Sequence, residues 1–321
     1  MHDHRFHRTA FQNAADRAEA ASSPVLERQM MIKNLLFEYP QFQSVIGNVA
    51  KFHIPVEDTG LADIGVVGGV MGESRAGKSK ILESYSRRFP SVVEDDIVTY
   101  PVVYIEARAD WDSLEFARQI FRATGKQYVP RAGVAAMNTA VTLRLRDHRT
   151  TLLIVDDSHF IFDSKRTRKT NVSLIKEIVD AQFCNVLLAG LPSIETAVEH
   201  EAQLRGRGGF PRFDVKAFNT KTKAGRDNYR LFLHGIDQRL PFAESSDLAS
   251  KAFSDELRRM SNGSVGLTMN VVRAAALMAL NAGTRRVLGT HLRAAAEQRA
   301  LLDRTRPGFG EEGEGGVDVY A

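Results

Sequence analysis

Short, almost continuous apolar runs alternate with longer amphipathic stretches through the middle of the chain. The runs are "DIGVVGGVMG" (63–72), "YPVVYIEA" (100–107), "TTLLIVDD" (150–157) and "CNVLLAG" (184–190). Such runs are typical of strands that are buried on both faces, and the spacing of apolar residues between them favours helices. The pattern therefore predicts an α/β fold with a parallel sheet between two layers of helices.

The two ends of the chain lack this alternation. Residues 1–60 are expected to form a helical leader, because "SSPVLERQMMIKNLLFEYP" (22–40) has a serine cap, an early proline and apolar residues at helical spacing. Residues 222–303 are rich in Ala and Leu, which predicts a small helical lid. The Gly-rich, acidic residues 304–321 are expected to be a disordered tail, which leaves 61–221 as the core.

The composition is that of a water-soluble protein, with 43% apolar and 26% charged residues in a chain of 321. The single cysteine, Cys184, excludes a disulfide framework and a four-thiolate zinc site, and it favours a cytoplasmic location. No apolar run reaches the ~18–20 residues of a membrane span, so no membrane partner is expected. A net charge of +4 mildly favours a polyanionic partner.

The stretch "GESRAGKSK" (72–80) has the spacing of a phosphate-binding loop: Gly, four residues, then Gly-Lys-Ser. It follows an apolar run and opens a predicted helix, which is the context that this motif requires. Successive backbone N–H groups in such a loop form an anion cradle, to which the lysine adds a point charge. The residues expected to bind the nucleotide are Gly72, Glu73, Ser74, Arg75, Ala76, Gly77, Lys78, Ser79 and Lys80.

Two aspartates follow the third apolar run, in "LLIVDDSHF". Asp156 is expected to hold Mg²⁺ together with the hydroxyl of Ser79. Asp157 stands where hydrolases of this kind place a carboxylate that orients or deprotonates water. In the alternative interpretation, one of the two aspartates only caps the following helix. His159 is expected to support the site or the core rather than to act as a base.

These motifs, in this order, resemble the AAA+ ATPases of transposons, the TniB and TnsC family, with MuB as a more distant relative. "VMGESRAGKSKILESY" resembles the family's phosphate loop and first helix, and "TTLLIVDDSHFI" its magnesium strand. "NVLLAGLPSIETAV" is similar to the sensor-one strand, and "MSNGSVGLTMNVVRAAALMAL" to the lid helices. "EAQLRGRGGFPRF" resembles the stretch that carries an arginine acting on a neighbouring subunit.

The resemblance implies an ATP- and Mg²⁺-dependent regulator that forms a homo-oligomer, a ring or a helical filament, on duplex DNA of any sequence. It would mark a target site and recruit or stimulate a transposase, alone or with a target-selector protein. Family members hold DNA through loops after the second strand, where this chain has Arg108, Lys126 and Arg131. A second basic stretch contains Lys165, Arg166, Arg168 and Lys169.

Four positions depart from the family pattern and imply slow hydrolysis with ATP binding retained. Asp157 replaces a glutamate, and Leu191 replaces the polar sensor-one residue, which leaves Ser193 nearby. Leu267 stands in place of the lid arginine, for which Arg273 is the nearest substitute. The family's Leu-Glu-Arg-Phe reads here as "LRGR", so the candidates for the arginine that reaches the neighbouring subunit are Arg205 and Arg207, with Arg212 as a third choice.

Two other function classes share the phosphate loop. A small-molecule kinase normally has neither the paired acid after the magnesium strand nor a long helical lid. A signalling switch, in which an ATPase core gates a protein partner, would suit the altered sensor positions.

Overall fold

The computed structural model describes residues 6–53, 64–109, 111–127, 132–163, 166–201 and 209–299. They form two compact units, one within residues 40–215 and one that combines residues before 40 with residues after 215. The predicted boundaries at 60/61 and 221/222 therefore differ from the observed ones. The difference arises because part of the predicted leader packs with the C-terminal helices, and the rest belongs to the core.

The core unit contains a five-stranded sheet in the order β4 (Val102–Glu106), β5 (Leu152–Asp156), β6 (Asn185–Gly190), β1 (Val67–Met71) and β7 (Arg212–Asp214). Every neighbouring pair is parallel, and the four strands predicted from the apolar runs are all present. The pattern does not predict β7, because this edge strand has only three residues and two of them are charged. A parallel sheet aligns the carboxyl ends of its strands at one edge, where ligands bind in folds of this class.

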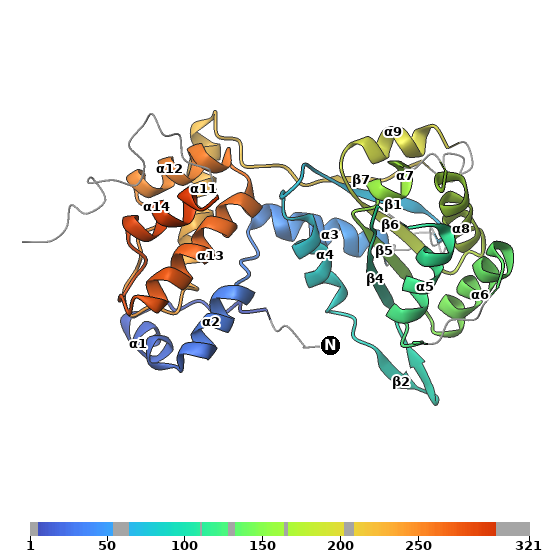
Figure 1. Ribbon diagram of the computed structural model, residues 1–321, viewed down its shortest axis with the longest axis horizontal. Helices are drawn as coiled ribbons and strands as arrows, with labels where there is room; N and C mark the ends of the chain where they lie inside the picture. Colours follow the sequence, from blue (N-terminus) through green and yellow to red (C-terminus); the bar gives the residue numbers. More distant parts are fainter. Residues whose placement is uncertain are drawn as a thin grey trace, which may run out of the picture. The chain divides into compact units, whose positions relative to one another are not determined.

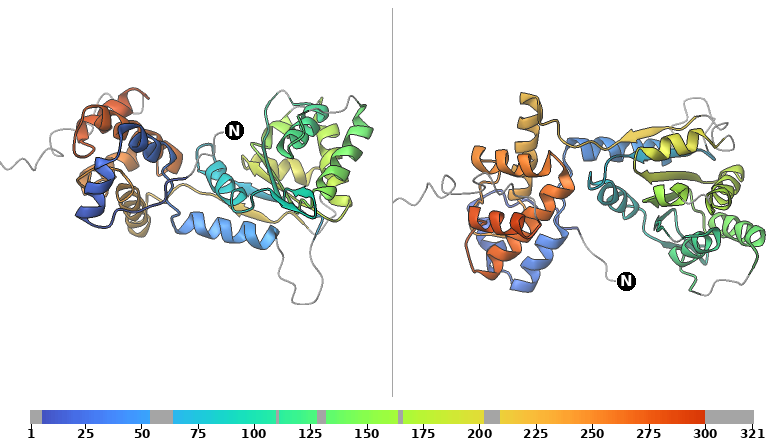
Figure 2. Two further views of the ribbon diagram at one scale, coloured as in Figure 1. Left: turned by 90° about the horizontal axis from the view of Figure 1, so that it is seen from below. Right: turned by 45° about the horizontal axis from the view of Figure 1, so that its top comes forward.

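Helices cover both faces of the sheet, as the predicted three-layer α/β class requires (Figure 2). One face is covered by α3 (Pro40–His53) and α4 (Lys78–Ser86), and the other by α5 (Ser113–Ala123), α6 (Val134–Asp147) and α8 (Arg168–Asp180). Two short helices, α7 (His159–Asp163) and α9 (Ser193–Glu199), follow the carboxyl ends of β5 and β6. The fold class predicted from the sequence is confirmed.

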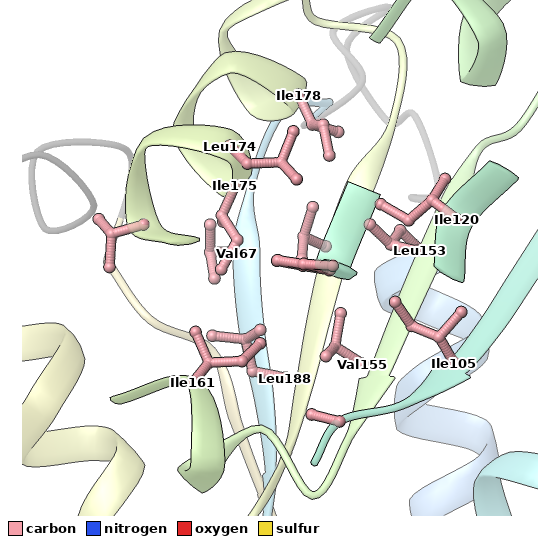
Figure 3. Close-up of a cluster of buried hydrophobic side chains, with 14 of the residues drawn as sticks. Val67, Ile105, Ile120, Leu153, Val155, Ile161, Leu174, Ile175, Ile178 and Leu188 are labelled. Atoms are coloured by element: carbon pink, nitrogen blue, oxygen red, sulfur yellow. The ribbon is translucent and has the colours of Figure 1, made fainter. Parts of the chain in front are cut away.

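A large apolar cluster lies between the sheet and the layer of α5, α6 and α8. Alternate residues of the strands, such as Val67, Leu153 and Leu188, point into it and meet Ile120, Ile175 and their helical neighbours (Figure 3). These side chains are at most 2% exposed, so they supply most of the hydrophobic stabilisation on this side of the sheet. The other residues of each strand point towards α3 and α4. The two aspartates therefore stand at the end of a fully buried strand.

A two-stranded antiparallel hairpin lies outside the main sheet. It pairs β2 (Val92–Glu94) with β3 (Ile97–Thr99), between α4 and β4 (Figure 1). Its turn residues Asp95 and Asp96 have positive φ angles, and Arg149 pairs with Glu94 and Asp95 at 3.0 and 2.9 Å. The apolar pattern does not predict this hairpin, because its strands are short and largely exposed.

Among its described residues, the second unit forms helices, with one isolated parallel bridge between His7 and Leu35. It contains α1 (Ala14–Ser22), α2 (Val25–Asn34), α11 (Lys223–Asp237), α12 (Lys251–Ser261), α13 (Val265–Asn281) and α14 (Gly289–Glu297). The long helix α13 contacts α2, α12 and α14. The predicted helices are present, but the predicted serine cap of α2 is wrong. Pro24 occupies its N-cap position without a side-chain hydrogen bond, and Ser23 closes α1 instead.

The described residues of the leader before Pro40 belong to this helical unit, because their apolar side chains pack against helices that follow residue 215. Tyr39 lies against the rings of Phe218 and Phe232, with ring centroids 5.5 and 5.3 Å apart. The guanidinium of Arg273, on α13, donates a hydrogen bond to the carbonyl oxygen of Leu35 at 2.8 Å. Arg273, the proposed substitute for the lid arginine, is thus engaged in packing α13 against the end of α2. Within the described residues, the helices are too short or too polar to cross a membrane.

A buried histidine, His53, connects helices α3 and α4 to the start of strand β5. His53, at the end of α3, is 6% exposed, and its ring nitrogens lie 2.8 Å from the Tyr85 hydroxyl and 2.7 Å from the Thr151 hydroxyl. Burial lowers the pKa of His53 to about 4. The folded protein therefore keeps this imidazole neutral at a pH where an unfolded chain would protonate it.

We expect His53 to make the protein sensitive to mild acid. Because its pKa is lower in the folded state, the unfolded state binds more protons, and stability falls as the pH drops from about 6.5 towards 4. The His53→Gln variant should be less stable at pH 7.5 but should lose less stability between pH 7 and pH 5 than the wild type. Denaturant unfolding at both pH values measures this difference. The exposed His200→Gln variant is the matched control, and an equal loss for all three proteins would contradict the prediction.

Candidate nucleotide site

The loop between β1 and α4 has the backbone geometry of an anion cradle. Arg75 and Gly77 have φ angles of 62° and 106°, both in the left-handed region, and Gly77 is the N-cap residue of α4. At Gly72, a Cβ atom would lie 2.3 Å from the carbonyl oxygen of Val215, which only glycine avoids. The loop therefore turns tightly and leads its backbone into the N-terminus of α4, where N–H groups favour an anion.

The loop closes around the amino group of Lys78. Its Nζ donates hydrogen bonds to the carbonyl oxygens of Gly72 and Glu73, at 2.8 and 2.9 Å, and the residue is only 6% exposed. Burial lowers the pKa of Lys78, while the negative charges of Asp156, Asp157 and Glu73 act to raise it. The predicted phosphate-binding lysine thus lies inside the loop and within electrostatic reach of both predicted acids.

The other loop residues divide into exposed and enclosed positions. Ala76 is buried, and its N–H donates to the carbonyl of Glu73 at 3.2 Å. Lys80 pairs with Glu83 on α4 at 2.7 Å, so its side chain is engaged along the helix surface. The residues that stand exposed around the loop are Glu73, Ser74, Arg75, Ser79 and Lys80. The hydroxyl of Ser79 is therefore accessible to a ligand.

Asp156 is held rigidly at the end of β5. It is 1% exposed, its Oδ1 accepts a hydrogen bond from the backbone N–H of Asp157 at 2.8 Å, and its Oδ2 accepts one from the hydroxyl of Tyr104 at 2.7 Å. The sequence motif identifies Asp156 but gives no sign of Tyr104, because the contact crosses from one strand to the next. A fixed carboxylate at this position suits a metal ligand.

Asp157 adopts a left-handed backbone conformation, with φ of 48°. Aspartate and asparagine tolerate this region better than most residues, which gives a local reason for an aspartate here in place of glutamate. Burial and the charge of Asp156 raise the pKa of Asp157, while His159 and Lys78 act to lower it. A carboxylate with a raised pKa is a stronger base, so Asp157 is suited to accept a proton. No helix cap by Asp157 is seen among the described hydrogen bonds.

The end of β6, between β5 and β1, lies next to these acids. Ser158 donates from its N–H and its hydroxyl to the carbonyl of Ala189, at 2.8 and 3.0 Å, which ties the turn after β5 to β6. Leu191 is partly buried after Gly190, and Ser193 is the exposed first residue of α9. His159 lies beside Gly190, and its Nδ1 is buried without a hydrogen-bond partner among the described atoms.

Of the three arginines predicted to reach a neighbouring subunit, Arg212 lies within the described residues. Arg205 and Arg207 lie outside the described residues. Arg212, the third candidate, is on β7, where its guanidinium pairs with Glu195 and lies 3.4 Å from Asp214. Arg212 is therefore engaged with carboxylates of its own chain.

The basic residues predicted to contact DNA do not form one cluster. Arg108 is exposed in the loop after β4, at the carboxyl edge of the sheet, whereas Lys126 is exposed beyond the far end of α5. The amino group of Lys126 lies 5.8 Å from the ring centroid of Phe121. The eleven residues of α5 separate these two positions by roughly 16 Å along the helix axis. Arg131 lies outside the described residues.

The second basic stretch is also split. Arg168 pairs with Glu201 at 2.8 Å and donates to the carbonyl of Ala197 at 3.0 Å, so it ties the start of α8 to the end of α9. Arg166 and Lys169 are exposed, and Lys165 lies outside the described residues. Only the exposed members of this stretch are suited to contact a partner.

The donor set at the carboxyl edge fits a nucleotide with Mg²⁺. Mg²⁺ is typically held by one or two carboxylates together with phosphate oxygens, and Asp156 and the Ser79 hydroxyl are oxygen donors on neighbouring elements. The enclosed amino group of Lys78 and the N-terminus of α4 supply positive charge for the phosphates. Together these groups can bind a nucleoside triphosphate and position a base beside it.

Comparison with known proteins gives a match to one family model and a shared fold. The family model described as "TniB: Bacterial TniB protein" matches residues 65–220, just under half of the chain. A comparison with curated proteins gave no match.

Solved structures share the fold at low sequence identity. The Aeropyrum pernix ORC1 protein in complex with DNA is 14% identical, with a TM-score of 0.56 over 81% of this chain and 64% of that chain. The Aeropyrum pernix ORC2 protein in ADPNP–ADP complexes is 15% identical, with a TM-score of 0.55 over 80% and 67%. Drosophila ORC bound to DNA is 14% identical, with a TM-score of 0.51 over 87% and 67%. This chain spans about two thirds of the length of each.

The predicted relationship is confirmed: this chain is an AAA+ ATPase, and its residues 65–220 match the TniB family model.

Proposed function

We propose that this protein is an ATP-dependent regulator of transposition that assembles on duplex DNA. The observation that carries the proposal is the enclosed Lys78, within electrostatic reach of Asp156 and Asp157, in a segment that matches the TniB family. Bound ATP would hold subunits together on the DNA, and slow hydrolysis would release them. The assembly would mark a target site and recruit or stimulate a transposase, alone or with a target-selector protein.

Each group of site residues would have a different role towards the nucleotide. The backbone of Gly72–Gly77 and the amino group of Lys78 would bind the phosphates, and Ser79 and Asp156 would hold Mg²⁺. The metal would neutralise charge on the phosphate oxygens when it is bound. Asp157 would accept a proton from the attacking water, and its raised pKa supports that role. An arginine from a neighbouring subunit, Arg205 or Arg207, would complete the site.

Duplex DNA is the proposed partner of this chain. The ORC1 structure and the Drosophila ORC structure, which share its fold, are described as bound to DNA. In this chain, Arg108 is exposed in a loop whose neighbour Ala107 donates its N–H to the carbonyl of Asp156 at 2.8 Å. Contact of that loop with DNA phosphates would therefore act close to the proposed magnesium ligand. Lys126 would extend the contact along α5, and Arg131 is a further proposed contact.

The Lys78→Ala variant should bind ATP at least tenfold more weakly and should not assemble on duplex DNA. Its charge faces the phosphates and cannot be replaced by packing. Electron microscopy and sedimentation, with DNA and a non-hydrolysable ATP analogue, measure the assembly. The Lys51→Ala variant changes an exposed lysine on α3 and should behave as the wild type.

The same experiment separates the function classes. Assembly that persists in Lys78→Ala would contradict a role for the loop. A wild-type protein that ignores DNA would overturn the proposal. Phosphorylation of a small molecule would then indicate a kinase, and assembly that requires a protein ligand would indicate a signalling switch.

Charge reversal should locate the DNA contact. We expect Arg108→Glu and Lys126→Glu each to weaken binding to duplex DNA and to lower the slope of log affinity against log salt by about one. Fluorescence anisotropy with labelled DNA at several salt concentrations measures both quantities. Lys51→Glu is the control for charge alone. If Arg108→Glu leaves the slope unchanged, the loop before α5 does not contact DNA, and if Lys126→Glu does so, the end of α5 does not. Arg166 and Lys169 would then be the next candidates for the DNA contact.

Removing the charge of Asp157 should slow hydrolysis without weakening ATP binding. Asparagine also tolerates a left-handed backbone, so Asp157→Asn isolates the loss of the base from backbone strain. We expect turnover to fall by about 10²-fold and the lifetime of the DNA-bound assembly to increase. ATP turnover and the decay of assemblies after nucleotide dilution measure these effects. Unchanged turnover would mean that Asp157 is not the base.

A further inference from the structure

Tyr104 connects β4 to the carboxylate at the end of β5. Its partner in register is Ile154, so Asp156 lies two residues further along β5 on the same face of the sheet. A diagonal neighbour of this kind is within reach of an aromatic side chain. The Tyr104 hydroxyl uses that reach to donate to Oδ2 of Asp156 at 2.7 Å.

The two oxygens of Asp156 are fixed from different sides. The backbone N–H of Asp157 binds Oδ1 from the same strand, and the phenol binds Oδ2 from the next strand. One bond alone would leave the carboxylate free to rotate about its Cβ–Cγ axis, whereas two bonds to different oxygens define its plane. Each oxygen keeps a second lone pair for a further partner.

The surroundings of Tyr104 are acidic, so the hydroxyl is suited to act only as a donor. Glu106 is in register with Asp156 on the same face, and Glu83 of α4 is near enough to influence Tyr104. The phenol donates its hydrogen bond to Oδ2 of Asp156, and this bond offsets part of the repulsion between the neighbouring carboxylates.

We propose that Tyr104 is a positioning residue for magnesium, which fixes the carboxylate of Asp156 so that a lone pair remains directed at the metal that accompanies ATP. This inference rests on the proposed function, in which Asp156 holds Mg²⁺. Hydrogen bonds to a metal-binding carboxylate orient it, and their loss typically lowers metal affinity or activity 10- to 100-fold. Tyr104 acts through Asp156 and does not touch the nucleotide.

The test compares nucleotide binding with and without metal. Affinity for a fluorescent ATP analogue is measured in EDTA and at saturating Mg²⁺, and the ratio of the two affinities gives the magnesium effect. In full-length Tyr104→Phe we expect unchanged affinity in EDTA and a magnesium effect reduced about tenfold. In an Asp156→Asn background, the same substitution should have no further effect, because its target is gone.

Tyr85→Phe is the matched control. It also removes a buried hydroxyl from the core unit, where Tyr85 lies 2.8 Å from a ring nitrogen of His53, but it should leave the magnesium effect unchanged. An unchanged effect in Tyr104→Phe, or equal losses of affinity in EDTA and in Mg²⁺, would overturn the inference. A wild-type protein that binds no ATP, or binds it regardless of Mg²⁺, would overturn the proposed function and this inference with it.

Discussion

The site depends on keeping the amino group of Lys78 charged in a place that is shielded from water. Desolvation opposes that charge, so the fold has to supply partners for it. Two loop carbonyls do so by direct hydrogen bonds, and the carboxylates at the end of β5 do so electrostatically. This requirement explains why the loop curls over its own lysine. The parallel sheet meets the same requirement, because it aligns the carboxyl ends of β1 and β5 at one edge, with only β6 between them.

The parts of the molecule that could be predicted from sequence are those governed by local patterns. The strands β1, β4, β5 and β6 are buried on both faces and read as apolar runs, and the glycine spacing of the loop reflects a backbone that other residues cannot adopt. Lys78 and Asp156 can be located in the same way, because Lys78 ends the glycine loop at the start of α4 and Asp156 is the last residue of β5. At these positions, the same short motif determines both the backbone conformation and the residues of the candidate site.

The features that could not be predicted depend on contacts between distant segments. Tyr104 looks like an ordinary strand residue until the register of β4 and β5 places it beside Asp156. From the sequence, Asp157 is only a shorter replacement for glutamate. The structure shows that its backbone is left-handed, a conformation that aspartate tolerates better than glutamate. The sequence pattern predicts the leader as a separate segment. In the structure, Tyr39 packs against Phe218, and the carbonyl of Leu35 accepts a hydrogen bond from Arg273. Local periodicity carries no information about such pairings.

The helical unit is built from two stretches of chain with the whole core unit between them, and this affects folding during synthesis. Residues before 40 leave the ribosome first, but the helices that cover Ile32, Leu35 and Tyr39 are made last. At about 5–20 residues per second, the core unit takes on the order of ten seconds or more to emerge. For that time the apolar side chains of α2 lack their native cover. During that time, the apolar residues of α2 in the nascent chain can bind chaperones or associate with the same segment of another copy.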